Sequence, residues 1–110
     1  MNLKISVPAG YKVDDYLDGN IDVNVVVDDR DVYFATLFTI RNIEKLLSEQ
    51  FLAKHYFWST DMIIVENLEV KTIKKAIENL VNDGILESAC TYIGRVEDLF
   101  VRYPLIRNLI

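Results

Sequence analysis

Side chains suited to nucleophilic or acid–base chemistry are few in this sequence. His55 is the only histidine and Cys90 the only cysteine, so a Ser–His–Asp or Cys–His site would have to use them. His55 falls at the end of a predicted helix, where a cation interacts favourably with the helix dipole. Cys90 falls in a predicted strand, and a free cysteine mainly behaves as a small buried hydrophobic residue. Both residues are therefore predicted to be structural.

Carboxylates are abundant, and two short runs of them have the oxygen ligands that a divalent cation needs. These runs are DDRD at residues 28–31 and DDYLD at residues 14–18. A calcium loop requires a glycine at its sharp turn and a glutamate at its end, and neither run has this spacing. Zinc favours histidine and cysteine ligands, which both runs lack. No metal and no cofactor is predicted, and DDRD is interpreted as a solvated hairpin tip.

Phosphate-binding patterns are missing, and the charge of the chain argues against nucleic acid as a ligand. PAGYK at residues 8–12 lacks the spacing of a phosphate-binding loop. KTIKK at residues 71–75 is basic, but it lies on the polar side of a predicted helix in a chain of net charge −5. In residues 1–40, seven aspartates outweigh three basic residues and leave a net charge of −4. Such a field repels nucleic acid and anionic membranes and attracts basic partners.

Most of these aspartates belong to IDVNVVVDDRDVYFATLF, residues 21–38, which predicts a β-hairpin. Its apolar residues alternate with mostly polar ones, as in strands that have one buried face. With a turn at residues 29–30, Val27 pairs with Val32 and Ile21 with Phe38. A slightly longer loop is the alternative, since a tight turn prefers glycine where Arg30 stands. In this register the second face carries Asp22, Asn24, Val26, Tyr33 and Ala35.

Two amphipathic helices and three further strands are predicted along the rest of the chain. One helix covers residues 39–54 with Thr39 as its N-cap, and the other precedes Gly84 as the C′ residue. Strands are predicted at residues 3–7, 56–65 and 85–93, and a short helix before Pro104. This order predicts an α+β fold, in which a mainly antiparallel sheet carries two amphipathic helices on one face.

A single domain accounts for residues 1–110, with its core at 21–88. The tail, residues 91–110, is too apolar to hang free, so it either packs on the domain or pairs two copies of the chain. No apolar run approaches the roughly 20 residues that span a bilayer. The apolar run at the N-terminus is too short for a signal peptide, and a single cysteine suits a reducing compartment. A cytoplasmic location is expected.

Asp61 stands inside the apolar run of YFWSTDMIIVEN, residues 56–67, and a charge there needs a reason. It could be a catalytic carboxylate, a buried group that accepts hydrogen bonds, or part of the solvent-facing side of a strand. Alternation along the strand places it with Ser59, away from the main core. This placement favours the solvent-facing interpretation, because an antiparallel sheet can leave one face in water.

Aromatic residues among charges are typical of protein–protein interfaces, and one polar face of the predicted sheet has this character. Its predicted partner-binding residues are Asp22, Asn24, Asp28, Asp29, Asp31, Tyr33, Phe57 and Asp61. A merely solvated face is the alternative, because area and charge alone do not establish affinity.

Three segments, VYFATLFTIRNIEKLL, YFWSTDMIIVENL and TIKKAIENLVNDG, resemble small acidic bacterial immunity proteins of polymorphic toxin systems, including those of contact-dependent growth inhibition. The similarity covers residues 21–88, and FWSTDMIIV is its most specific part. Arg30 and Glu69 depart from the turn glycine and the cap threonine expected in this group. Its members share no catalytic motif, so no functional residue is assigned by position. The resemblance implies a cytoplasmic protein that binds and neutralises one cognate toxin.

Three functions remain open on the sequence. An immunity protein would inhibit its toxin, for example a nuclease with a basic surface, in a stoichiometric complex without turnover. A small adaptor or accessory module would bind a housekeeping protein instead. An enzyme would have to use the aspartates and His55, but catalytic spacing is missing. The chain is therefore predicted not to be an enzyme, and its predicted partner is a basic protein rather than nucleic acid or membrane.

Overall fold

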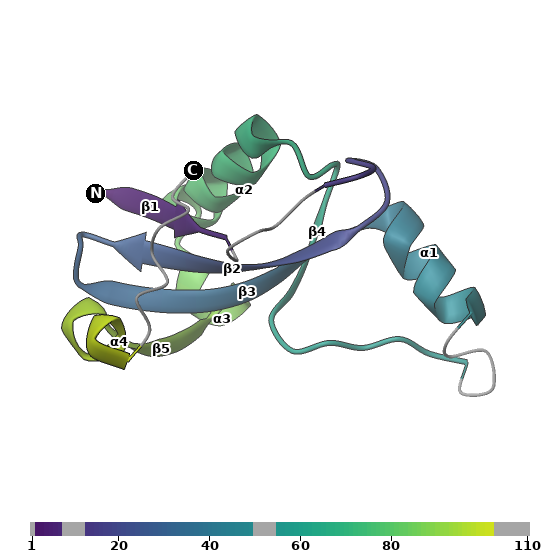
Figure 1. The fold of residues 1–110 in the computed structure, drawn as a ribbon. Helices are drawn as coiled ribbons and strands as arrows, with labels where there is room; N and C mark the ends of the chain where they lie inside the picture. The colour runs from purple at the N-terminus through teal and green to yellow at the C-terminus, as the bar shows by residue number, and fades with distance from the viewer. Residues whose placement is uncertain (1, 8–12, 50–54, 103–110) are drawn as a thin grey trace.

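The computed structural model describes residues 2–7, 13–49 and 55–102, which form a sheet and several helices (Figure 1). Within these residues the sheet has five strands: β1 (Leu3–Ser6), β2 (Asn20–Val27), β3 (Asp31–Thr39), β4 (Met62–Val65) and β5 (Thr91–Arg95). The described helices are α1 (Ile40–Glu49), α2 (Val70–Asn82), α3 (Leu86–Ala89) and α4 (Val96–Arg102). No helix in this part of the chain is long and apolar enough to cross a membrane.

The sheet is mixed but mainly antiparallel, which confirms the predicted α+β class. β1, β2 and β3 pair antiparallel in that order. The other edge of β3 is shared by two strands. β5 pairs antiparallel with residues 31–34 of β3, and β4 pairs parallel with residues 36–39. The edge of β3 therefore changes its partner strand at Ala35.

The turn between β2 and β3 is one residue longer than the predicted turn at Asp29 and Arg30. Asp28 and Asp29 have left-handed φ angles of 54° and 52°, and the Arg30 N–H donates to the Val27 carbonyl oxygen at 3.0 Å. Two left-handed central residues define a type I′ turn, whose twist matches that of the strands. Aspartate tolerates this conformation because its short polar side chain can hydrogen-bond locally. Arg30 is the extra residue, so Val27 pairs with Asp31.

The longer turn makes the predicted hairpin register wrong by one residue. Val25 pairs with Tyr33 rather than with Phe34, and Ile21 pairs with Leu37. Because side chains alternate between the faces of a strand, this shift turns every side chain of β3 to the other face. Tyr33 and Leu37 therefore lie on the face of the main core, and Phe34 lies on the opposite face.

The main core lies between one face of the sheet and α2 (Figure 1). α2 contributes Ile73 and Ile77, which are both buried. The buried cluster consists of Ile5, Ile21, Val23, Val25, Val27, Ala35, Leu37, Val65, Leu68, Ile73, Ile77, Leu86 and Cys90. Its members come from four strands and two helices and from the residues beside them, so burial of this cluster ties the sheet to α2 and α3.

α2 ends at the predicted glycine. Gly84 has φ of 72°, and its N–H donates to the Val81 carbonyl oxygen at 3.0 Å. The N–H of Ile85 reaches back to the Leu80 carbonyl oxygen, also at 3.0 Å. These two bonds form a Schellman motif, which satisfies carbonyl groups that the end of a helix leaves unpaired. The chain can then turn directly into α3.

α1 extends from the end of β3 and projects beyond the sheet (Figure 1). Thr39 is its N-cap as predicted, because the Asn42 N–H donates to the Thr39 Oγ1 at 3.3 Å. None of its described side chains belongs to the main core, and Ile40 is 56% exposed. Of the two long helices, α2 is thus the one that covers a face of the sheet.

The face opposite α2 is not simply solvated. Val26, Val32 and Phe38 point to it, and all three are buried. α4 lies on this side, because a Cβ placed on Gly94, the partner of Val32, would be 3.7 Å from the Leu99 Cγ. The expectation of an open face is therefore corrected: this side of the sheet carries a second, smaller apolar layer.

Two predicted strands are corrected in part. The strand predicted at 56–65 is reduced to β4, because β5 occupies the neighbouring part of the β3 edge. The segment predicted as a strand at 85–93 contains α3, and β5 begins only at Thr91. The short helix predicted before Pro104 is α4. Pro104 and the rest of the apolar tail, 103–110, lie outside the described residues.

Candidate functional site

The predicted partner-binding residues do not share one surface. Asp22 and Asn24 lie on the face opposite α2, and Phe57 packs against the same face, away from the β2–β3 turn. The Thr36 hydroxyl group donates to the Asp22 carboxylate at 2.9 Å. The ring of Phe57 packs edge-on against Phe38, with 5.3 Å between the ring centroids. Asp22 and Phe57 thus make contacts that hold this side of the sheet together.

Asp61 lies just before β4 and connects three strands. Its φ of 55° is left-handed, so extended structure begins only at the next residue. Its carbonyl oxygen accepts the Thr36 N–H of β3 at 3.0 Å. Its carboxylate accepts the Thr91 hydroxyl of β5, with Thr91 Oγ1 at 2.7 Å and 2.6 Å from the two oxygens. The carboxylate therefore accepts a hydrogen bond, as the second interpretation requires, but Asp61 is half-buried rather than buried.

Cys90 and His55 lie in very different surroundings. Cys90 is buried beside α3, and burial raises the pKa of its thiol to about 11, with the charge of Asp61 adding to the effect. The thiol is therefore protonated, and weakly nucleophilic, at neutral pH. His55 is exposed and has a left-handed φ of 62°. Among the described residues, no group of three or more His, Cys, Asp or Glu side chains is placed to hold a metal ion.

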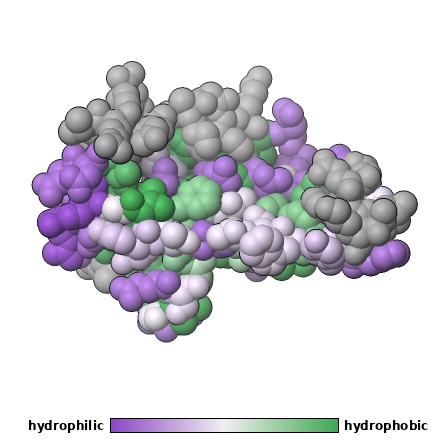
Figure 2. All heavy atoms as spheres, turned by 90° about the horizontal axis from the view of Figure 1, so that it is seen from below, coloured by the Kyte–Doolittle hydropathy of each residue, from purple (hydrophilic) through white to green (hydrophobic). Residues whose placement is uncertain are grey.

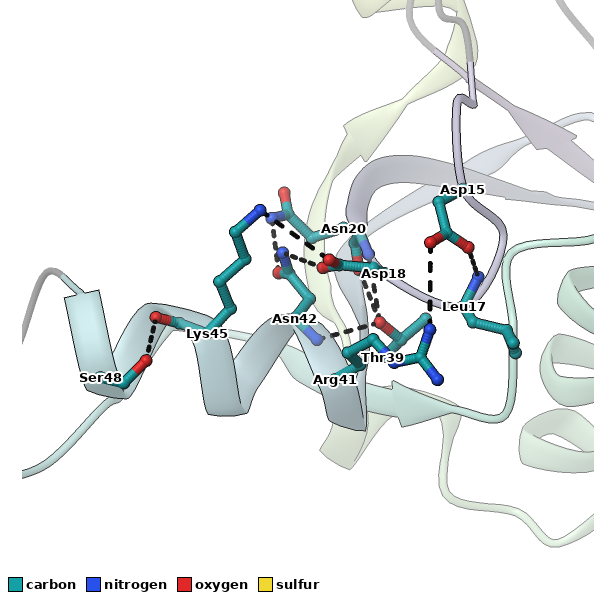
Figure 3. A network of polar contacts seen from close by, with 10 residues as sticks. Asp15, Leu17, Asp18, Asn20, Thr39, Arg41, Asn42, Lys45 and Ser48 are labelled. Carbon is teal, nitrogen blue, oxygen red and sulfur yellow. Dashed lines mark hydrogen bonds and ion pairs between the residues drawn. The ribbon is translucent and has the colours of Figure 1, made fainter.

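Two aspartates of the acidic run at residues 14–18 contact side chains of α1 (Figure 3). Asp18 accepts a hydrogen bond from the Asn42 side chain at 3.4 Å and lies 3.9 Å from the Lys45 ammonium group. Asp15 lies 4.0 Å from the guanidinium of Arg41. Basic and amide groups of α1 therefore compensate these carboxylates at the end of the sheet remote from the β2–β3 turn.

Thr39 is the centre of that network (Figure 3). Its hydroxyl oxygen accepts the Gly19 N–H at 3.1 Å and donates to the Gly19 carbonyl oxygen at 3.3 Å. The same oxygen caps α1 through the Asn42 N–H. Thr39 is 1% exposed, and loss of its hydroxyl would leave the half-buried N–H groups of Gly19 and Asn42 without this acceptor. The network is therefore structural: it joins the segment before β2 to the end of β3 and the start of α1, and we name it the Thr39 clamp.

The remaining four predicted residues gather around the β2–β3 turn. β1 and the residue before it contact two of them from one side. The Asn2 N–H donates to the Asp28 carboxylate at 2.9 Å, and the Lys4 ammonium group contacts the Asp29 carboxylate at 2.6 Å. A group of strongly hydrophilic residues marks this end of the molecule, which also carries α4 (Figure 2).

The other side of the turn brings two tyrosines against two carboxylates. The Tyr92 hydroxyl group donates to the Asp31 carboxylate at 3.2 Å, and the Tyr33 hydroxyl group makes a longer bond of 3.5 Å to Glu87. The two rings meet edge to face, with 5.4 Å between their centroids. Arg30 binds the second Asp31 oxygen through its Nε at 2.9 Å. Two strands and α3 therefore meet at one polar cluster.

Beside this cluster lies a groove of about 430 Å3 between the β2–β3 turn and the segment that joins α2 to α3. We name it the tip groove, and it is lined by Val27, Asp28, Arg30, Asp31, Tyr33, Val81, Gly84, Leu86 and Glu87. Three carboxylates and one guanidinium give the lining a net charge of −2. Three aliphatic side chains add apolar surface.

Ionisation of the tyrosines reflects this negative environment. Burial, followed by the charges of Glu87 and Asp31, raises the pKa of Tyr33. Desolvation and the hydrogen bond to Asp31 raise the pKa of Tyr92. The hydrogen bond from Arg30 lowers the pKa of Asp31, so that carboxylate stays ionised. At neutral pH the groove thus presents the neutral ring of Tyr33, with Tyr92 packed against it, beside charged carboxylates.

This arrangement is complementary to a lysine or arginine side chain of another protein. The aliphatic part of such a side chain can lie along Val81 and Leu86 while its charged end meets carboxylates. Charge-assisted hydrogen bonds to carboxylates are stronger than neutral ones, and a cation also interacts with the face of a tyrosine ring. The tip groove is therefore the candidate binding site.

Sequence reasoning found part of this site and missed the rest. Asp28, Asp31 and Tyr33 were predicted to bind a partner, and they line the groove. Glu87 and Tyr92 were missed, because the segment 85–93 was predicted as one strand with no assigned neighbour. Both residues join the site through tertiary contacts, the Tyr33–Glu87 bond and the pairing of β5 with β3, which no local sequence pattern signals.

No family model, no curated protein and no solved structure matches this chain.

Proposed function

We propose that this chain is an immunity protein, which binds a cognate bacterial toxin through the tip groove and neutralises it in a stoichiometric complex. The observation that supports this proposal is the combination of carboxylates, the Tyr33 ring and apolar surface in one groove. The resemblance of residues 21–88 to immunity proteins suggests that the partner is a toxin. In this proposal the chain performs no turnover and acts in the bacterial cytoplasm.

A basic toxin suits the tip groove on physical grounds. A nuclease needs a basic surface to hold the phosphate backbone of its substrate, and an acidic protein can occupy that surface instead. Complementary charge accelerates association and suppresses wrong partners. Tyrosine and arginine are frequent among the residues that dominate binding energy at interfaces. Glu87 and Asp31 would supply the charge, and Tyr33 the aromatic contact.

Protection from the toxin tests this function. The proposal predicts that a gene beside that of this chain encodes the toxin. The chain is co-expressed with the domain of that toxin, and cell growth is measured. Wild type should restore growth, and Glu87→Lys should reduce protection, because it places a positive charge where the toxin is basic. Glu44→Lys is the matched control: it reverses an exposed glutamate on α1, outside the tip groove, and should protect like wild type.

A binding module with a housekeeping partner gives a different result in this experiment. Deletion of the gene would then impair growth in cells that lack any toxin, and co-expression would protect nothing. Loss of protection in both glutamate variants would also contradict the proposed role of the tip groove, because a general effect of charge reversal would explain it.

A further inference from the structure

β4 has one edge that no strand covers in the part of the chain that the structure describes. The Asp61 carbonyl oxygen accepts the Thr36 N–H, so Asp61 directs its backbone groups toward β3. Backbone groups alternate in direction along a strand, and Ile63 therefore also faces β3. Met62 and Ile64 direct their N–H and C=O groups away from β3, toward the uncovered edge.

The uncovered edge is apolar. β4 reads MIIV, and the side chain of Ile64 is 51% exposed. Exposed strand edges are templates for pairing with another chain, and proteins usually block them with charges, proline or a covering segment. β4 itself contains no charge and no proline. The edge therefore keeps its capacity to pair with an extended peptide.

A groove of about 570 Å3 runs between this edge and α2. It is lined by Ile64, Val65, Glu66, Lys71, Thr72, Lys75, Ala76 and Asn79. One side of the groove is thus the edge strand and the residue after it, and the other side is a polar face of α2. A peptide that pairs with β4 would have α2 beside it.

The charge of this groove is opposite to that of the tip groove. Its lining has two ammonium groups and one carboxylate, in a chain of net charge −5. Lys71 and Lys75 contact Glu69 and Glu78 at 3.7 Å and 3.9 Å. These are long, exposed ion pairs of the kind that contributes little to stability, so both lysines can be recruited by another carboxylate.

The spacing of the two lysines matches an extended peptide. Lys71 and Lys75 are four residues apart in α2, which is about 6 Å along a helix axis. Alternate side chains on one face of a strand are roughly 6.6 Å apart. Acidic side chains at alternate positions of a strand that runs along α2 would therefore meet the two lysines in turn.

We propose that the free edge of β4 binds an extended segment of a partner protein that carries acidic side chains at alternate positions. The segment adds a strand to the sheet through the backbone groups of Met62 and Ile64. Its carboxylates lie against Lys71 and Lys75. This site is separate from the tip groove and does not depend on toxin binding.

Two labelled peptides test the proposal: a decapeptide of alternating Glu and Val, and its counterpart with Lys in place of Glu. Fluorescence anisotropy should show that the Glu peptide binds at least ten times more tightly than the Lys peptide. Backbone amide NMR signals of residues 62–66 should shift on binding. The double variant Lys71→Glu/Lys75→Glu should reduce affinity for the Glu peptide at least tenfold.

Two further variants separate the edge from general charge effects. Ile64→Pro removes an N–H that points away from β3, so it should weaken peptide binding while the protein stays folded. Lys74→Glu is the matched control, because Lys74 lies on α2 but lines a different groove, and binding should stay unchanged. Equal binding of both peptides, amide shifts confined to other residues, or a self-associated dimer that blocks β4 would overturn the proposal.

Discussion

The Thr91 hydroxyl group donates its hydrogen bond to the Asp61 carboxylate, with both carboxylate oxygens within 2.7 Å of Thr91 Oγ1. This contact joins β5 to the residue that precedes β4. It lies where the edge of β3 changes from one partner strand to the other, at Ala35. A hydrogen bond between two side chains therefore connects the antiparallel pair β3–β5 with the parallel pair β3–β4.

Loss of this bond should destabilise the protein without changing its fold. We expect Asp61→Ala and Thr91→Val each to lower the free energy of unfolding, and the pair to show a coupling energy of about 1 kcal/mol in a double-mutant cycle. The cycle removes the separate cost of alanine in the left-handed conformation of Asp61. Asp14→Ala is the control, because Asp14 is an exposed aspartate in the loop before β2. Additive single effects in urea unfolding would show that the contact contributes nothing.

Thr39 supports two elements through one hydroxyl group, and its removal should be costly. Thr39→Val keeps the shape of the side chain but removes the cap of α1 and both hydrogen bonds between the hydroxyl group and Gly19. We expect a loss of about 1–2 kcal/mol in the free energy of unfolding, which is typical of a lost N-cap. Thr60→Val, at an exposed threonine in the turn before β4, should change stability much less. Equal melting temperatures of the two variants would contradict the role of the Thr39 clamp.

Cys90 should make stability fall at alkaline pH. Burial raises the pKa of its thiol from 9.0 to about 11 in the folded protein, so the unfolded chain loses this proton first. Its contribution is fully present below about pH 9 and is lost as the pH rises toward 11. We expect Cys90→Ala to show a shallower decline in melting temperature over this range than wild type. An identical slope in both proteins would contradict the buried thiol.

Thiol modification checks the same residue independently. Native protein at pH 8 should react with iodoacetamide far more slowly than protein unfolded in guanidinium chloride, because the thiolate is the reactive form. Fast alkylation of the native protein would show that the thiol is exposed or ionised.

Local patterns allowed much of the fold to be predicted from the sequence. The alternation in residues 21–38 predicted the hairpin, and helical periodicity with Gly84 predicted α2 and its end. The hairpin register could not be predicted, because it depends on Asp28 adopting a left-handed conformation that aspartate tolerates but does not require. One residue of turn length then decided the face on which Tyr33 lies.

The remaining differences depend on contacts between distant segments. No local signal says that β5 and β4 share one edge of β3, so the break before β4 at Asp61 was not predicted. The candidate site was predicted only where it is local, at Asp28, Asp31 and Tyr33. Glu87 and Tyr92 join it through pairings across more than 50 residues of sequence, as the bonds of Glu87 to Tyr33 and of Tyr92 to Asp31 show.

Calorimetric titration of the chain with the toxin domain that the proposed function expects to be encoded beside its gene is the most direct test of that function. We predict a 1:1 complex whose affinity falls at least tenfold in Glu87→Lys, equivalent to about 1.4 kcal/mol, with a larger loss at low salt than at high salt. Glu44→Lys should bind like wild type, and both variants should keep the wild-type melting temperature. Absence of a complex with wild type would contradict the immunity function, and equal affinities of wild type and Glu87→Lys would contradict the tip groove as its binding site.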